Sequence, residues 1–285
     1  MNLASPREVT DLLAKYKIRP NKALGQNFLI DRNILNMVVN CAELCSDAKV
    51  VEVGAGLGIL TEQLIAGSAH VTAIEKDRGL YSVLSDKFGG ENRLSLILGD
   101  ALEIDLDGMF KNGATRLVSN LPYSVGTRVV VDAAISDTPP AIMSLLLQKE
   151  VGERFAAKPG TSDIGAVTVW LQQLYDVSMV HIVKPSCFYP KPDVMSVIVK
   201  LKRHNKFPLN RQDSEFFRLL AKTAFLHRRK QLASSMRNVP HEVARSSEFI
   251  RSALQKAGAS ETARPEEISV EQWIKLSAIW REPSQ

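Results

Sequence analysis

The chain has 285 residues, of which 45% are hydrophobic and 24% charged, with a formal net charge of +5. This is the composition of an ordinary globular protein, and the length favours one large domain or two unequal ones. The first residues, MNLASPREVTDLL, contain no apolar signal region, and no window approaches the ~18 apolar residues of a membrane span. We therefore expect a soluble, cytoplasmic protein with no membrane partner.

Strand-like and helical patterns alternate from about residue 33 to 150. Buried strands are predicted over 49–54, 70–77, 94–100, 115–120 and 141–148, and helices over 59–67, 78–90 and 124–135. Such alternation predicts a parallel sheet with helices on both faces. Two later β-rich runs, 177–183 and 194–201, are predicted to extend this sheet as an antiparallel edge.

After residues 201–210 the sequence becomes helix-forming, with no further β-branched run. Short helices are predicted over 214–225, 228–236, 246–258 and 269–280, the last capped by Ser269. The predicted domains are therefore an α/β domain over 1–205, including a basic segment over 1–30, and a small all-helical domain over 206–285.

Three cysteines, Cys41, Cys45 and Cys187, are too few for a disulfide framework. We interpret Cys41 and Cys45 as buried free thiols, because unpaired cysteine behaves as a small hydrophobe. None of the five histidines lies close to this pair in the sequence, so no metal site is expected.

The first predicted strand runs into a glycine loop, EVGAGLG, with Gly54, Gly56 and Gly58. The third glycine falls one residue early for the dinucleotide fingerprint, and this spacing favours an adenosyl ligand lying along the loop. Glu75 ends the second strand, 21 residues after Gly54, where an acid can accept hydrogen bonds from both ribose hydroxyls. Asp100 ends the third strand and can accept from an adenine amine. Each acid alone would be a helix cap, but together they predict a nucleoside pocket.

The fourth strand ends in Asn120-Leu121-Pro122-Tyr123, which in isolation is a turn sequence. Two acceptors aimed at the N–H bonds of an exocyclic aromatic amine would help to draw its lone pair out of the ring, and the Asn120 side-chain oxygen and the Leu121 carbonyl can supply them. Pro122 holds Leu121 in an extended conformation, which fixes the direction of that carbonyl. Tyr123 offers a ring on which a base can stack, worth about 1–3 kcal/mol.

The segments EVGAG, AIEKD, GDAL and NLPY, in this order, resemble the S-adenosylmethionine-dependent methyltransferases. With KALGQNFLID, CFYPKPDVMS and AFLHRRKQL added, nearly the whole chain resembles the rRNA adenine N6,N6-dimethyltransferase family, and most of all its bacterial housekeeping type. The resemblance implies a Rossmann-like methyltransferase domain that uses S-adenosyl-L-methionine and leaves S-adenosyl-L-homocysteine. The implied targets are two adjacent adenosines in a hairpin loop near the 3′ end of small-subunit (16S) rRNA.

The resemblance also implies roles for individual residues. Cofactor contacts are implied for Asn27, Leu29, Gly54, Gly56, Glu75, Asp100 and Asn120. Phe188, in the Phe-x-Pro-x-Pro segment, would form the wall of the base pocket opposite Tyr123, although a core aromatic at a strand start remains an alternative.

The excess of positive charge lies in the second domain. Residues 206–285 hold 14 Lys and Arg against 9 Asp and Glu, whereas residues 1–205 hold 22 of each. Between Phe216 and His241 there is no acidic residue. Phosphate contacts are predicted for Arg218, Lys222, Arg228, Arg229 and Lys230, and for Lys22 in a second basic cluster. An alternative is that the basic residues 228–230 join the two domains through carboxylates.

The expected partner is the small ribosomal subunit or its rRNA, and nothing in the sequence demands an oligomer, so a monomer is expected. Three other readings stay open: a DNA adenine methyltransferase, a large-subunit rRNA dimethylase of the antibiotic-resistance type, and a non-catalytic assembly factor. A DNA enzyme usually needs a larger recognition domain than 80 residues. The glycine spacing disfavours a nicotinamide dehydrogenase.

Overall fold

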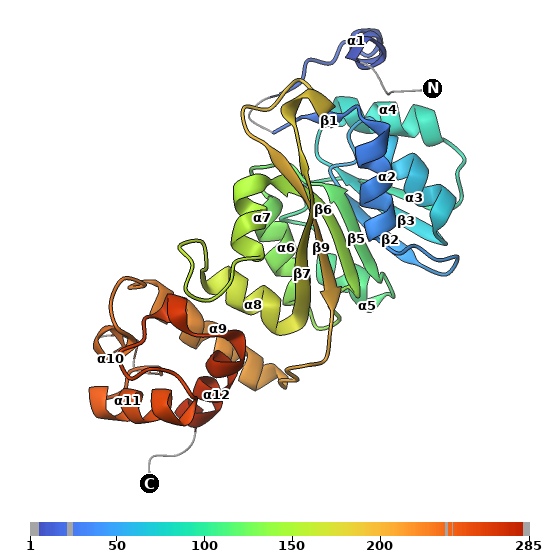
Figure 1. The fold of residues 1–285 in the computed structure, drawn as a ribbon. Helices are drawn as coiled ribbons and strands as arrows, with labels where there is room; N and C mark the ends of the chain where they lie inside the picture. Colours follow the sequence, from blue (N-terminus) through green and yellow to red (C-terminus); the bar gives the residue numbers. More distant parts are fainter. Residues whose placement is uncertain (1–5, 22–24, 237–238, 241, 282–285) are drawn as a thin grey trace. The chain divides into compact units, whose positions relative to one another are not determined.

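The computed structural model describes residues 6–21, 25–236, 239–240 and 242–281 (Figure 1). The chain divides into two compact units. Unit 1 comprises Met1–Gly152 and Asp176–Arg203, and unit 2 comprises Glu153–Tyr175 and His204–Gln285. The second unit therefore takes in a segment, 153–175, that the sequence interpretation assigned to the first domain. No helix of the described residues is long and apolar enough to cross a membrane.

A seven-stranded sheet forms the centre of unit 1, with strand order β4-β3-β2-β5-β6-β9-β7. Its strands are β2 (Lys49–Val53), β3 (His70–Glu75), β4 (Leu94–Leu98), β5 (Arg116–Asn120), β6 (Ile142–Gln148), β7 (Tyr175–Val183) and β9 (Ser196–Arg203). Strands β2 to β6 pair in parallel, and β9 pairs with β6 in the opposite direction. The five predicted parallel strands and the antiparallel addition are confirmed, so the carboxyl ends of β2, β3, β4 and β5 share one edge.

Helices cover both faces of this sheet, with α2 and α3 on one face and α6 on the other (Figure 1). The helices of unit 1 are α1 (Pro6–Lys15), α2 (Arg32–Cys41), α3 (Ile59–Gly67), α4 (Arg78–Phe88), α5 (Leu106–Lys111), α6 (Gly126–Ala134) and the start of α7 (Lys149–Phe155). Aspartates begin three of them: Asp31 accepts from amides of the first turn of α2, and Asp77 and Asp105 do the same for α4 and α5. The apolar faces of α2 and α3 then pack on Val50, Val71 and Ala73 of the sheet.

Two additional elements lie ahead of the glycine loop in the chain. The short strand β1 (Phe28–Leu29) pairs antiparallel with β8 (Phe188–Tyr189), and β8 follows the 3-10 turn η2 (Pro185–Cys187). Helix α1 buries Val9, Leu12 and Leu13 in a cluster with Phe28 and Leu80. Phe28 and Leu29 are thereby held next to the glycine loop by apolar burial and by one short β-pair.

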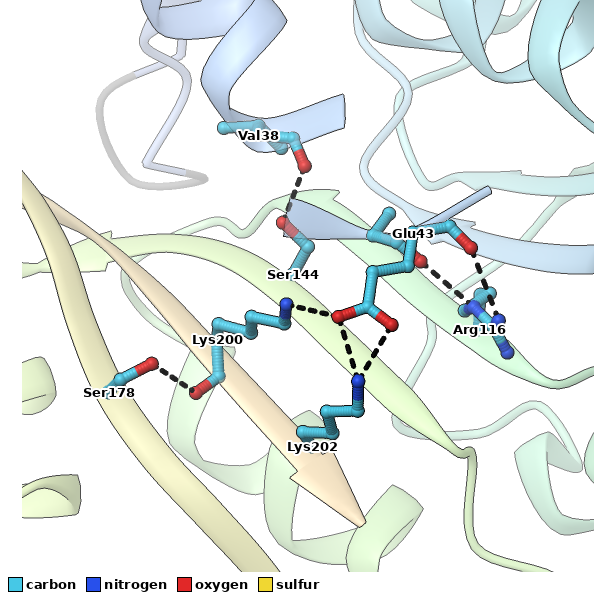
Figure 2. A network of polar contacts seen from close by, with 8 residues as sticks. Val38, Glu43, Arg116, Ser144, Ser178, Lys200 and Lys202 are labelled. Carbon is cyan, nitrogen blue, oxygen red and sulfur yellow. Dashed lines mark hydrogen bonds and ion pairs between the residues drawn. The ribbon is translucent and has the colours of Figure 1, made fainter. Parts of the chain in front are cut away.

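A charged cluster joins the end of α2 to the sheet (Figure 2). The Glu43 carboxylate pairs with Lys200 and Lys202 of β9, and Arg116 of β5 donates to the carbonyls of Ala42 and Glu43 at 2.9 and 3.2 Å. Glu43 adopts φ 47°, a left-handed conformation that ends the helical turn. The two lysines hold the pKa of Glu43 down, to about 2.

Unit 2 is helical. It contains the end of α7, then α8 (Ala166–Leu174), α9 (Arg211–Phe225), α10 (Leu232–Ser235), α11 (Ser247–Lys256), the 3-10 turn η3 (Pro265–Glu267) and α12 (Val270–Arg281). Its core contains Trp273 and Trp280, both fully buried, and also takes in Ile164 and Val169 from the first of its two segments. Segment 153–175 belongs to unit 2 because its apolar side chains complete this core. The predicted cap is confirmed: the Ser269 hydroxyl accepts from the Gln272 amide at 3.2 Å.

Two local predictions were wrong. The helix predicted over 228–236 is confined to Leu232–Ser235, because a turn closes before it, with the Lys230 amide donating to the His227 carbonyl at 2.8 Å. Cys45 is exposed rather than buried, since α2 ends at Cys41 and Cys45 lies beyond the face that packs on the sheet. Cys41 and Cys187 are half-buried free thiols.

Candidate functional site

A pocket opens in unit 1 at the carboxyl edge of the parallel strands. All seven residues for which a cofactor contact was predicted line it: Asn27, Leu29, Gly54, Gly56, Glu75, Asp100 and Asn120. Leu121, Pro122 and Tyr123 line the same pocket. The structure thus brings together residues from four strand ends and from the segment that precedes α2, which is the usual location of a ligand site in an open α/β sheet.

The glycine loop closes one side of the pocket. Gly54 has φ +74°, and a Cβ atom there would lie 3.1 Å from the Pro122 ring. A side chain at Gly54 would therefore strain the backbone and push Pro122 away. The loop and the Asn-Leu-Pro-Tyr turn can approach each other closely only because residue 54 has no side chain.

Glu75 is the acid that holds the loop in place. Its two carboxylate oxygens accept hydrogen bonds from the backbone amides of Gly56, at 2.8 Å, and Asp77, at 2.9 Å. Burial raises the pKa of Glu75, and the two amide donors oppose that rise. The cap of α4 is Asp77, not Glu75, so the Glu75 carboxylate keeps its remaining lone pairs for a ligand in the pocket.

Asp100 has a partner that the sequence interpretation did not include. Its carboxylate lies 2.6 Å from the Lys76 ammonium and accepts from the Leu102 amide at 3.0 Å. The Lys76 hydrogen bond is the main reason that the pKa of Asp100 is lowered. Lys76 also lines the pocket, so Asp100 stays ionised and able to accept further hydrogen bonds.

The Asn120 side chain is oriented by the backbone of the segment before α2. Its Nδ2 donates to the Asn27 carbonyl at 3.0 Å. A carbonyl can only accept, so the amide nitrogen must face Asn27, and Oδ1 must point the other way. Among the described residues Oδ1 has no donor, and it is therefore free to accept one from a substrate.

The rest of this turn is held by the sheet. The Leu121 amide donates to the Leu146 carbonyl at 3.1 Å, whereas no described residue donates to the Leu121 carbonyl. The Tyr123 hydroxyl hydrogen-bonds the hydroxyl of Ser196, which is fully buried, at 2.6 Å. Burial raises the pKa of Tyr123. Its half-buried ring is thus anchored at the hydroxyl end and lines the pocket at the other.

Phe188 does not line this pocket. It is 1% exposed, pairs with Leu29 across the β1–β8 ladder and packs in the core cluster of α2 and α3. The ring occupies the core position that was the alternative to a base-stacking role, because β8 turns it toward the sheet. From the β1–β8 ladder, the residues that line the pocket are Phe28 and Leu29 of β1.

The basic residues of unit 2 differ in their surroundings. Arg229, Lys230 and Lys222 are exposed. Arg228 pairs with Glu266 at 3.1 Å and donates to the Ser162 carbonyl at 2.7 Å. Both partners belong to unit 2, so Arg228 joins the two segments of that unit. Arg218 is half-buried, and Lys22 and Arg237 lie outside the described residues.

Four residues at the site were missed: Gly25, Glu52, Lys76 and Ser196. Gly25 has φ +66°, and a Cβ there would lie 3.1 Å from the Tyr123 amide nitrogen. Of these four, only Glu52 could have been recognised from the sequence, because it is the one charged residue within the apolar run VVEV. No group of three or more His, Cys, Asp or Glu side chains suited to a metal occurs in the described part of the chain.

Sequence comparisons identify similar proteins over nearly the whole chain. A family model described as "Ribosomal RNA adenine dimethylase" matches residues 18–280. Two proteins named "Ribosomal RNA small subunit methyltransferase A" are similar to this chain. The one from Halothermothrix orenii is 35% identical over 99% of this chain and 96% of its own length. The one from Clostridium acetobutylicum is 36% identical over 93% of this chain and 95% of its own.

Two crystal structures resemble the whole fold. The 23S rRNA methyltransferase ErmE superposes with a TM-score of 0.68 at 25% identity, covering 90% of this chain and 100% of its own. A dimethyladenosine transferase from Plasmodium falciparum gives a TM-score of 0.73 at 22% identity, covering 87% of this chain and 95% of its own. The predicted fold class, a Rossmann-like domain followed by a small helical one, is confirmed.

Proposed function

The chain belongs to the ribosomal RNA adenine dimethylase family, and on that premise we propose how its own residues carry out the reaction. The protein is an rRNA adenine-N6,N6-dimethyltransferase, and its relatives at 32–36% identity are named for the small subunit. The proposed substrates are two adjacent adenosines in a hairpin loop near the 3′ end of 16S rRNA. The proposed methyl donor is S-adenosyl-L-methionine.

The observation that best supports this function is the fixed orientation of the Asn120 amide. With Nδ2 bound to the Asn27 carbonyl at 3.0 Å, Oδ1 and the free Leu121 carbonyl are two acceptors on consecutive residues. An adenine N6 amine has two N–H bonds. If both point at these acceptors, the nitrogen lone pair is drawn out of conjugation with the ring and becomes available for bond formation.

The pocket residues fit an adenosyl cofactor. Glu75, 6% exposed, is placed by two backbone amides to accept from ribose hydroxyls, and the ionised Asp100 lies one strand further along the sheet for the adenine amine. At Gly54 an added Cβ would meet the Pro122 ring, so glycine allows the loop to lie close to the turn. When bound, the cofactor supplies an electrophilic methyl group on a sulfonium.

The protein positions the amine, and the reaction needs no strong base. Asn120 and Leu121 hold the amine while its lone pair forms the N–C bond. Transfer of the sulfonium methyl group would leave S-adenosyl-L-homocysteine. The amine proton is acidified by the new bond and passes to solvent. Tyr123, with its hydroxyl tied to Ser196, presents a fixed ring against which the adenine stacks. Repetition on the same nitrogen gives the dimethylated base.

RNA affinity is assigned to unit 2. Lys222, Arg229 and Lys230 are exposed on α9 and on the turn that follows it, and we propose that they contact phosphates. Arg228, which is paired with Glu266, instead has a structural role. Because phosphate contacts carry no sequence information, the choice of adenosine rests with the pocket in unit 1.

Large-subunit methylation is the second candidate, since ErmE shares the fold at 25% identity. The higher identity to the relatives named for the small subunit favours methylation of small-subunit rRNA. The test is incubation with labelled S-adenosylmethionine and small subunits from cells lacking the modification, followed by mapping of the methylated bases. Large subunits and duplex DNA serve as controls. Label confined to either control would overturn the assignment.

A further inference from the structure

Exposed apolar side chains gather in one short stretch of unit 1. Nine large apolar side chains of the described residues are exposed, and four of them lie between residues 180 and 195. They form what we call the apolar ledge: Val180, Ile182, Val194 and Met195, each 38–46% exposed. The first two belong to β7, and the other two lie in the segment that leads into β9, the neighbour of β7 in the sheet. Single exposed apolar residues are common, but a cluster of them marks a binding surface.

The ledge lies at the same edge of the sheet as the pocket. Ser196 begins β9, opposite the carboxyl end of β6, and its hydroxyl hydrogen-bonds the Tyr123 hydroxyl at 2.6 Å. Two residues span at most about 7 Å of extended chain, so the Cα atoms of Val194 and Met195 lie within that distance of the Ser196 Cα. In the middle of the same segment β8 pairs with β1, whose two residues line the pocket (Figure 1). The ledge therefore adjoins the mouth of the pocket on the Tyr123 side.

The charges around the ledge suit a polyanion. Lys184 and Lys191 are exposed, and neither ammonium forms an ion pair with a described residue. Asp193 is the one acid between β7 and β9, and Lys149 and Glu150, which follow β6 at the same edge, add one charge of each sign. An apolar floor beside unpaired cations is suited to single-stranded RNA, whose bases pack on the floor while its phosphates meet the lysines.

A target adenosine enters the pocket with its neighbours still attached. Because the strand is continuous, the adjacent nucleotide must stay at the mouth of the pocket while the target base is inside. We propose that the apolar ledge is a second base site, which holds the purine next to the target, and that Lys184 and Lys191 contact the phosphates of that part of the strand. The inference rests on the proposed function: when one of the two adjacent adenosines is in the pocket, the other lies on the ledge.

RNA fits this surface better than a protein segment does. An extended peptide could pair with the open edge of β7, which ends the sheet. That edge alone would not explain why unpaired lysines lie beside the ledge, or why the ledge adjoins Tyr123. A purine also covers more apolar surface than a pyrimidine, so the ledge should favour adenosine over uridine as the neighbouring base.

The experiment couples a change in the ledge to a change in the RNA. The protein variant is Val194→Ser combined with Met195→Ser. The substrates are small subunits lacking the modification, either with both adenosines or with one of the two replaced by uridine. In one of the two uridine versions, wild type should methylate the remaining adenosine with a kcat/KM about tenfold lower. The variant should already be about tenfold slower on subunits with both adenosines, and should lose little more on that uridine version.

Two controls and one further variant accompany this comparison. Ile135→Ser changes an apolar side chain of unit 1 that is 40% exposed but lies at the end of α6, and it should behave as wild type. Calorimetric titration with S-adenosylmethionine should give the same Kd for all three proteins, because the ledge residues do not line the pocket. Lys184→Gln combined with Lys191→Gln should reduce the slope of log affinity for subunits against log salt by about 1.4, at about 0.7 per phosphate contact.

The outcomes are distinct. Losses from the variant and from the uridine substrates that add independently would overturn the inference, because the ledge and the neighbouring base would then not meet. A loss of subunit binding that is equal on all substrates would indicate a protein partner on the ledge and would also overturn it, as would an unchanged salt slope. If wild type methylates neither adenosine of subunits that have both, the proposed function itself is wrong, and the inference fails with it.

Discussion

Replacement of Asn120 tests the proposed mechanism most directly. Asn120→Ala removes the Oδ1 acceptor and also the 3.0 Å hydrogen bond to the Asn27 carbonyl. Loss of one preorganised transition-state partner typically costs about 2.7–4 kcal/mol, or about 10²–10³ in rate. The Asn27 hydrogen bond is an ordinary neutral one, worth about 0.5–1.5 kcal/mol, which corresponds to at most about tenfold.

Asn120→Asp separates the two effects. It keeps an acceptor oxygen directed toward the substrate but loses the donor to Asn27. We expect this variant to stay within about tenfold of wild type, and Asn120→Ala to be about 10²–10³ slower. The assay is single-turnover methyl transfer on pre-bound small subunits at saturating cofactor, with cofactor affinity measured separately.

Two results would refute this reasoning. If Asn120→Ala binds subunits normally and transfers both methyl groups at near wild-type rate, the turn has no catalytic part. If the aspartate variant is as slow as the alanine variant, the Asn27 contact controls the rate and the acceptor does not.

Four further expectations concern other parts of the structure. Glu75→Ala should weaken S-adenosylmethionine binding by about 1.5–3 kcal/mol and lower the Tm, because it leaves two backbone amides without an acceptor; unchanged affinity by calorimetry would contradict the ribose assignment. Tyr123→Phe should keep most of the activity while Tyr123→Ala loses about 10–100-fold, which single-turnover rates will check, since the ring and not the hydroxyl meets the base. Combined reversal of Arg229 and Lys230 to glutamate should weaken subunit binding and flatten its salt dependence without changing cofactor affinity; parallel salt titrations would exclude phosphate contacts. Glu43→Gln should lower the free energy of unfolding by at most about 1 kcal/mol above pH 4.5, because the carboxylate is 40% exposed. Since the folded pKa is depressed to about 2 from 4.5, the difference should shrink as the pH falls between these values, and a difference at pH 2 as large as that at pH 5 would show that the ion pair is not its source.

Local patterns predicted most of unit 1. The glycine loop, the strand ends at Glu75 and Asp100 and the helix after each strand follow from short-range periodicity, and the parallel register then brings the strand ends to one edge. This is why the pocket residues at the strand ends could be predicted from the sequence.

The parts that the sequence did not reveal depend on contacts between distant residues. The hydrogen bond from Asn120 to Asn27 spans 93 positions, and that from Tyr123 to Ser196 spans 73. The inward turn of Phe188 follows from a two-residue ladder, which is too short to give a pattern. Ile164 likewise belongs to unit 2 because its side chain packs in the core of that unit.

The interrupted path of the chain through unit 2 has a consequence for synthesis on the ribosome. A nascent chain that has emerged as far as residue 205 already holds all seven strands of the large sheet. Strand β7 cannot join the sheet until β9 has been synthesised, because β9 lies between β7 and β6. Helix α8 packs later still, because the core in which Val169 is buried forms only after α9 to α12 have been synthesised. A gene truncated at residue 205 would thus release a chain with a complete sheet and an uncovered apolar helix, prone to aggregate.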